Sequence, residues 1–182
     1  EVVLDMQAIL KIIDRLCLGG AYAAAVLLAA LFLLGFAEIV LRSGFGISLS
    51  FSVEYSGYLL VLVLFLGSGW TLLNAGHIRV TLVSEVVSDR AAHVLDVVCT
   101  TVALVVSVIL SIALIQYTYG TWVRGTLSYY SSETPLAYPQ ALLAFGLIIL
   151  TLALIARALR LLSGRPADIR SEVSDVSNSE VS

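Results

Sequence analysis

Three charged side chains stand beside apolar stretches, where they could act on protons or ions: Glu38, Arg42 and Glu54. Glu38 precedes Arg42 by four residues, so the two share one face of a helix, and Glu54 follows a short loop from which it can reach the same arginine. An ionisable side chain inside a membrane is by default a candidate functional residue, because it is costly to place there. A proton relay through Glu38 would need a second carboxylate deep in another apolar stretch, and the sequence has none. We therefore predict that the three side chains form an ion cluster at the outer face of the membrane that the chain crosses, where it fixes this loop.

The histidines and cysteines are the other candidates for chemistry. Haem in a membrane helix bundle is held by histidines inside facing helices, whereas His77 follows Gly76 just past an apolar stretch and His93 opens another. Cys17 and Cys99 stand alone in apolar surroundings, without zinc-ligand spacing. No Gly-rich phosphate loop, catalytic triad or His-Glu-x-x-His helix is present. We expect no cofactor, no metal and no enzymatic activity.

Composition places the chain in a membrane. Its mean hydropathy is +1.00 and 13% of its residues are charged, against about 25% in an average soluble domain. A crossing needs about 20 apolar residues. Four stretches satisfy this requirement and predict an all-α integral membrane protein, with crossings at about 16–41, 53–73, 94–119 and 139–161.

Two further segments have different patterns. Residues 78–88 place valines on one helical face and Thr, Ser and Glu on the other, which predicts an amphipathic helix lying along the membrane surface between the second and third crossings. Residues 163–182 repeat Ser-Glu-Val and Ser-Asp-Val, and are predicted to be a disordered tail after a membrane domain spanning 1–162. The chain begins at Glu1, with Met6 as an alternative start.

The distribution of Lys and Arg predicts orientation. An even number of crossings puts both termini on one side, together with the 74–92 segment. That side holds Lys11, Arg15, Arg79, Arg90, Arg157, Arg160, Arg165 and Arg170, and the other holds Arg42 and Arg124. The positive-inside rule therefore predicts cytoplasmic termini.

Small and aromatic residues indicate contact surfaces. Gly20 and Ala24 have the small-xxx-small spacing of packed membrane helices, and Gly67 and Gly69 notch the second crossing. The alternative, that Gly and Ala are simply common in membrane helices, stays open. Aromatic residues gather at the predicted outer end, and four of them form a candidate docking face: Trp122, Tyr129, Tyr130 and Tyr138.

A family resemblance follows from these residues. In chain order its signals are Arg42, Glu54 opening a helix, Phe65-Leu66-Gly67, Gly76-His77-Ile78-Arg79-Val80, and Thr134-Pro135 through Pro139. This pattern, covering residues 10–162, resembles the small membrane subunit (DctQ-like) of tripartite ATP-independent periplasmic (TRAP) transporters. Two departures are Phe51 or Val53 where a Trp often precedes the acidic residue, and Thr81 where an Asp commonly follows the Val.

The resemblance implies a non-enzymatic partner subunit in a bacterial inner membrane. A large membrane subunit would carry an organic acid and sodium ions by an elevator-like movement, a periplasmic binding protein would capture the substrate, and this chain would support the large subunit. His77 and Arg79 would then anchor the inner interface, and Glu38, Arg42 and Glu54 the outer loop. Two rivals stay open: a membrane anchor of a redox enzyme, and a stand-alone channel or exporter.

Overall fold

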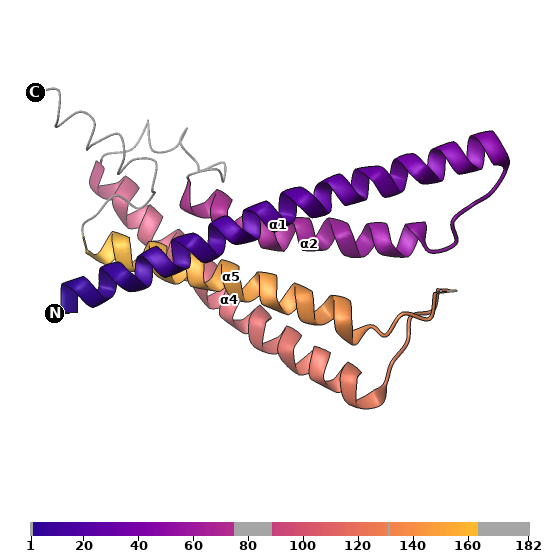
Figure 1. The fold of residues 1–182 in the computed structure, drawn as a ribbon. Coiled ribbons are helices and arrows are strands. Elements are labelled where there is room, and N and C mark those ends of the chain that lie inside the picture. The colour runs from indigo at the N-terminus through magenta and orange to yellow at the C-terminus, as the bar shows by residue number, and fades with distance from the viewer. Residues whose placement is uncertain (1, 75–88, 131, 164–182) are drawn as a thin grey trace, which may run out of the picture.

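The computed structural model describes residues 2–74, 89–130 and 132–163. Within these ranges the chain forms four helices and no strand (Figure 1). They are α1 (Val2–Phe45), α2 (Ser52–Leu73), α4 (Asp89–Arg124) and α5 (Ala137–Leu162). Each is long and apolar enough to cross a membrane, which confirms the predicted all-α membrane fold. The predicted surface helix at 78–88 and, beyond Ser163, the predicted tail lie outside the described residues.

Two of the helices extend well past the apolar stretches that predicted them. α1 has 44 residues, which at roughly 1.5 Å per residue makes it about 66 Å long, twice a hydrocarbon core of about 30 Å. α4 has 36 residues. Both helices end where glycine takes a left-handed conformation, at Gly46 (φ 67°) and Gly125 (φ 60°). After α4, the Thr126 N–H bonds the Thr121 carbonyl and the Gly125 N–H bonds that of Trp122, a Schellman cap.

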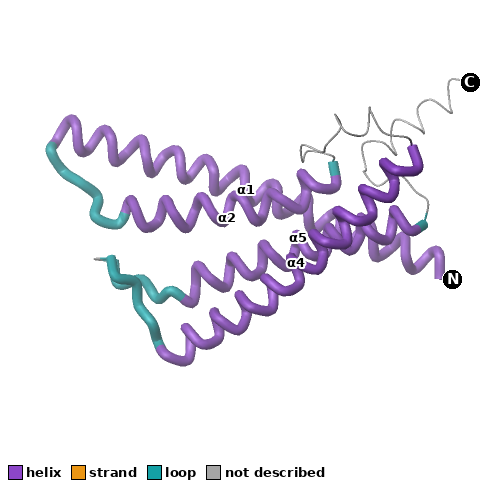
Figure 2. Tube along the Cα trace, turned by 180° about the vertical axis from the view of Figure 1, so that it is seen from behind, coloured by secondary structure: helices purple, strands orange, loops and turns teal. Residues whose placement is uncertain are grey.

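The helices form two hairpins, α1 with α2 and α4 with α5. Both connecting loops lie at one end of the molecule, and the start of α1 and the end of α5 lie at the other (Figure 2). The hairpins cross closely near that second end and diverge toward the loops (Figure 1). α5 is central because it packs against α1, α2 and α4. The core between α1, α2 and α5 is built from Leu10, Ile13, Cys17, Ala24, Leu62, Leu66, Leu73, Ile149, Ala153 and Ala156.

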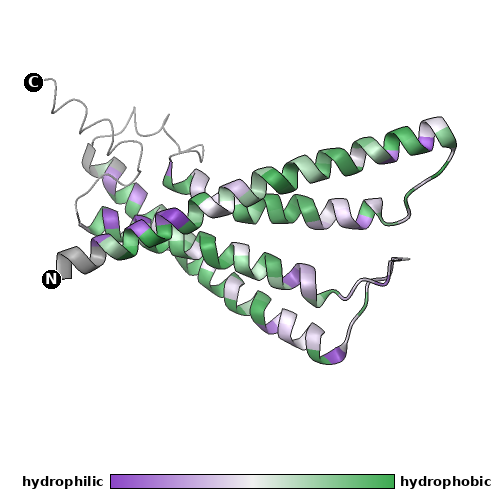
Figure 3. Cartoon of the chain, viewed as in Figure 1, coloured by the Kyte–Doolittle hydropathy of each residue, from purple (hydrophilic) through white to green (hydrophobic). Residues whose placement is uncertain are grey.

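α4 turns its polar side inward. The buried residues among those of α4 whose side chains are described are Thr100, Ser107, Ser111 and Thr121, while large apolar side chains such as Ile109 stay exposed. The Ser107 and Ser111 hydroxyls lie 2.6 and 3.1 Å from the Thr151 hydroxyl of α5. Hydroxyl contacts of this kind join membrane helices because lipid offers no competing partner. Along the helices as a whole, hydrophilic residues concentrate toward the two ends of the molecule, and hydrophobic residues cover most of the length between them (Figure 3).

Candidate functional site

Two buried arginines of α5 connect three helices at the end opposite the loops. Arg160 Nη2 lies 2.9 and 2.8 Å from the two carboxylate oxygens of Asp14 in α1. Arg157 Nη2 lies 2.9 and 3.1 Å from those of Asp96 in α4, and its Nε donates to the Thr100 hydroxyl at 3.2 Å. α5 is therefore tied to α1 and to α4 by one ion pair each.

Both arginines are buried inside the bundle, since only 3% of Arg157 and 5% of Arg160 is exposed. A charge at this depth is costly unless it is paired, and breaking a buried pair by removing one partner typically costs about 3–5 kcal/mol. Arg160 uses one nitrogen for both bonds to Asp14, and its Nη1 has no hydrogen-bond partner within the described part of the chain. Asp14 therefore supplies the main compensation for the Arg160 charge.

Sequence reasoning missed these two links. Arg157 and Arg160 entered it only as positive charges that set orientation, and Asp14 was not singled out. A usable signal was present: two arginines three residues apart inside an apolar helix face the same way, and Asp14 and Asp96 stand near the polar ends of two apolar stretches that start from the same side.

At the opposite end, Glu38 organises the loop between α1 and α2. Its carboxylate accepts hydrogen bonds from the Ser48 hydroxyl (2.9 Å) and the Leu49 N–H (2.8 Å), and it lies 3.6 Å from Arg42 Nε. Arg42 also donates to the Ser48 hydroxyl at 3.3 Å. The structure thus brings Glu38 and Arg42 together across one helical turn, and their contacts hold the start of the loop.

Glu54 is placed differently from the expectation that it joins Arg42. The residue is 4% exposed, and its carboxylate accepts hydrogen bonds from Tyr58 (2.6 Å) and Ser132. Beside it the Tyr55 and Thr134 hydroxyls lie 3.3 Å apart. The expected three-residue cluster is therefore divided, because Arg42 is paired on its own helix while Glu54 faces the α4–α5 loop. Glu54 instead links the two hairpins at their loop ends.

Replacing Glu54 with glutamine tests this link. The amide keeps the size of the side chain but loses the charge that strengthens its accepted hydrogen bonds. We expect backbone amide exchange across 126–136 to accelerate about tenfold, because the loop opens more readily. Hydrogen–deuterium exchange with mass spectrometry measures it. Glu133→Gln removes the same charge from an exposed position in the same loop, so equal acceleration in the two variants would contradict the link.

The predicted packing glycines lie where helices touch. A Cβ added to Gly20 would lie 2.7 Å from the Leu66 carbonyl oxygen, and one added to Gly67 would meet the Ala24 Cβ at 3.5 Å. One on Gly69 would lie 3.2 Å from Cys17 Sγ and from Ile149 of α5. Gly146 of α5, which sequence reasoning did not identify, comes as close to α2, with 3.0 Å to the Phe65 Cβ.

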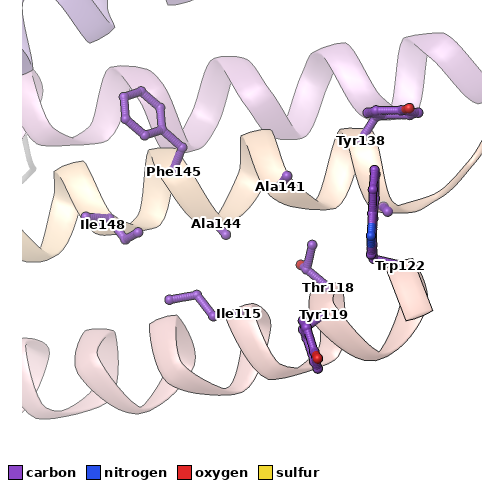
Figure 4. A pocket seen from close by; sticks show the side chains of 10 residues that line it. Ile115, Thr118, Tyr119, Trp122, Tyr138, Ala141, Ala144, Phe145 and Ile148 are labelled. Carbon is purple, nitrogen blue, oxygen red and sulfur yellow. The ribbon is translucent and has the colours of Figure 1, made fainter. Parts of the chain in front are cut away.

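The aromatic candidates occupy two places. Trp122 and Tyr138 meet edge to face, with ring centroids 5.9 Å apart, at one end of an apolar groove of about 400 Å³ between α4 and α5 (Figure 4). Tyr129 and Tyr130 stand on the loop, where Tyr129 is fully exposed and Tyr130 half exposed. The four side chains therefore form a rim and a loop tip at the same end of the molecule.

The remaining candidates have simple surroundings. Across the described ranges, no three His, Cys, Asp or Glu side chains are grouped so that they could hold a metal ion. Cys17 is a buried free thiol and Cys99 an exposed one. His93 is exposed. His77 and Arg79 lie outside the described residues.

The family model described as "Tripartite ATP-independent periplasmic transporters, DctQ component" matches residues 31–164, well over half of the chain. No curated protein and no solved structure gave a match. The matched range begins inside α1 and contains α2, α4 and α5. The chain therefore belongs to the DctQ family and is a multi-pass membrane protein, the small component of a TRAP transporter rather than an enzyme.

Proposed function

We propose that this chain supports a large membrane subunit during sodium-coupled, binding-protein-dependent uptake of an organic acid. The observation that carries the proposal is the ionic connection of α5 to both α1 and α4 through Arg160 and Arg157. A partner that moves substrate by an elevator-like displacement needs a stationary element to move against. A bundle joined by buried ion pairs at one end and by the Glu54 hydrogen bonds at the other suits that role, because its helices resist sliding past one another.

The distribution of polar groups supports assigning transport itself to the partner. The buried hydroxyls of Ser107 and Ser111 in α4 are engaged with Thr151, and the groove between α4 and α5 has an almost entirely apolar lining. A site for an organic anion would need convergent polar or cationic groups. We propose that substrate and sodium ions bind the large subunit and that this chain carries no cofactor.

Orientation follows from the Lys and Arg distribution, and we propose an inner-membrane protein with both termini in the cytoplasm. The pairing of Arg157 and Arg160 with aspartates does not weaken this argument, since the positive-inside rule counts Lys and Arg rather than net charge. His77 and Arg79 would lie at the cytoplasmic interface and anchor it. The loops that contain Ser48 and Tyr129 would face the periplasm.

This orientation gives the aromatic rim and loop tip a role. We propose that Trp122, Tyr129, Tyr130 and Tyr138 form a docking face for the periplasmic binding protein. Aromatic side chains are enriched in protein interfaces, and the loop that presents Tyr129 is held by the hydrogen bond from Ser132 to Glu54. A docking loop fixed in advance loses less conformational entropy when the partner binds.

Assembly is the direct test of this function. Affinity-tagged chain, expressed together with the large membrane subunit of its transporter, is expected to retain that subunit through size-exclusion chromatography in mild detergent. Recovery of the tagged chain free of the large subunit would contradict the proposal. An absorption spectrum of the same material distinguishes this function from that of a redox-enzyme anchor, because a haem band would favour the anchor.

A further inference from the structure

One face of α1 combines two exposed cations with an apolar track. Lys11, Arg15, Gly19, Tyr22 and Val26 recur at intervals of three or four residues, which keeps them on one side of a helix. We call these five residues the basic stripe. Lys11 and Arg15 are exposed, and Tyr22 and Val26 are 68% and 69% exposed. The stripe faces away from the bundle, because the core residues of α1 lie on its opposite side.

Within the described residues, no carboxylate forms an ion pair with either cation of the stripe. Asp14, the acidic residue between them in sequence, turns toward α5 and binds Arg160 with both carboxylate oxygens. Neither Lys11 nor Arg15 makes an ion pair or side-chain hydrogen bond within the described part of the chain. Two positive charges therefore stand together where α1 enters its apolar stretch, and this place favours an anionic ligand at the membrane surface.

The rest of the stripe favours a ligand with an apolar part. A Cβ added to Gly19 would meet nothing within 4 Å, so the surface of α1 is lowered directly beside Arg15. Beyond it, Tyr22 and Val26 lead toward the middle of the membrane. From the start of α1 inward, the stripe therefore presents two cations, then a notch, then apolar side chains. The cations match the phosphate of a phospholipid, and the notch and apolar side chains match its acyl chain.

We propose that the basic stripe binds an anionic phospholipid, with its phosphate between Lys11 and Arg15 and one acyl chain along Gly19, Tyr22 and Val26. This binding does not depend on the transport function, since it requires only this chain and lipid. In the orientation proposed above, the lipid belongs to the cytoplasmic leaflet and holds α1 at a fixed depth.

Native mass spectrometry of the purified full chain in detergent tests the proposal. Dioleoylphosphatidylglycerol and dioleoylphosphatidylcholine, which differ in headgroup only, are titrated in parallel. We expect the wild-type chain to prefer phosphatidylglycerol. Arg15→Gln should weaken that binding about fivefold, and Lys11→Gln with Arg15→Gln about 25-fold, because each basic contact at an anionic surface is worth about a factor of five.

Matched variants identify the stripe as the site. Arg124→Gln removes one exposed arginine from the far end of α4 and should change affinity less than about twofold. Gly19→Leu fills the notch and should weaken binding, whereas Gly57→Leu, at an equally open glycine of α2, should not.

Three results would overturn the proposal: equal binding of the two lipids, an equal loss in Arg124→Gln and Arg15→Gln, or displacement of the lipid by sodium phosphate at matched concentration. The last result would mean that the cations recognise free phosphate. Binding of phosphatidylglycerol that depends on Gly19 and on both cations supports the phospholipid site.

Discussion

Replacing Asp14 with leucine is expected to destabilise the folded chain by about 3–5 kcal/mol, because it leaves the buried Arg160 guanidinium without its carboxylate. Arg160 is 5% exposed and its described hydrogen bonds both go to Asp14. Replacing Arg160 with methionine should cost less, since the side chain of Asp14 is 25% exposed and retains contact with its surroundings. The free energy of unfolding, measured by chemical denaturation in micelles, gives both values.

The double variant distinguishes the stabilisation that the ion pair itself contributes from the cost of leaving the buried Arg160 charge without a partner. Asp14→Leu with Arg160→Met replaces the pair with apolar groups, and buried pairs exchanged in this way are often near neutral in stability. We expect the double variant to be at least about 2 kcal/mol more stable than Asp14→Leu alone. Additive losses would mean that the two side chains act independently. Arg124→Met, at an exposed arginine, is the control and should change stability by about 0.5 kcal/mol or less.

Substituting alanine for Gly20 is the second large effect, expected at about 1–3 kcal/mol of destabilisation. The new Cβ would lie 2.7 Å from the Leu66 carbonyl oxygen. The clashing atom is backbone, so α1 and α2 must separate along their shared face. This loss exceeds the gain of up to about 1 kcal/mol that alanine normally brings to a helix.

The neighbouring glycine provides the control for this substitution. A Cβ at Gly19 meets nothing within 4 Å, so Gly19→Ala should be neutral or slightly stabilising. Unfolding midpoints measured in the same detergent compare the two variants. Equal shifts would contradict a close contact of α1 with α2 at Gly20.

Apolar composition predicted the existence of the four helices and, for the two shorter ones, nearly their limits. The range 53–73 compares with Ser52–Leu73 for α2, and 139–161 with Ala137–Leu162 for α5. α1 and α4 extend beyond the predicted crossings, because apolarity reports which residues contact lipid, whereas a helix continues until its backbone is interrupted. The polar residues that precede the predicted crossings, such as Asp14 before the first, are helical all the same.

Whether a polar contact could be predicted from the sequence depends on whether its two residues are close together or far apart in the chain. Glu38 and Arg42 are one turn apart on one helix, so their proximity follows from helical geometry. Asp14 and Arg160 are 146 positions apart, and their meeting depends on α1 packing beside α5, a tertiary contact that the spacing within one helix does not determine. The same reason explains Glu54, whose partner Ser132 lies 78 positions away on the other hairpin.

Uptake into proteoliposomes tests most directly whether this chain is a support rather than a carrier. Three preparations are compared: this chain alone, the large subunit alone, and both together, each with the substrate-loaded binding protein outside and an inward sodium gradient. We predict uptake only when both membrane subunits are present, and its loss when the sodium gradient is removed. Substrate uptake by vesicles containing this chain alone, or full uptake by vesicles that lack it, would contradict the support role.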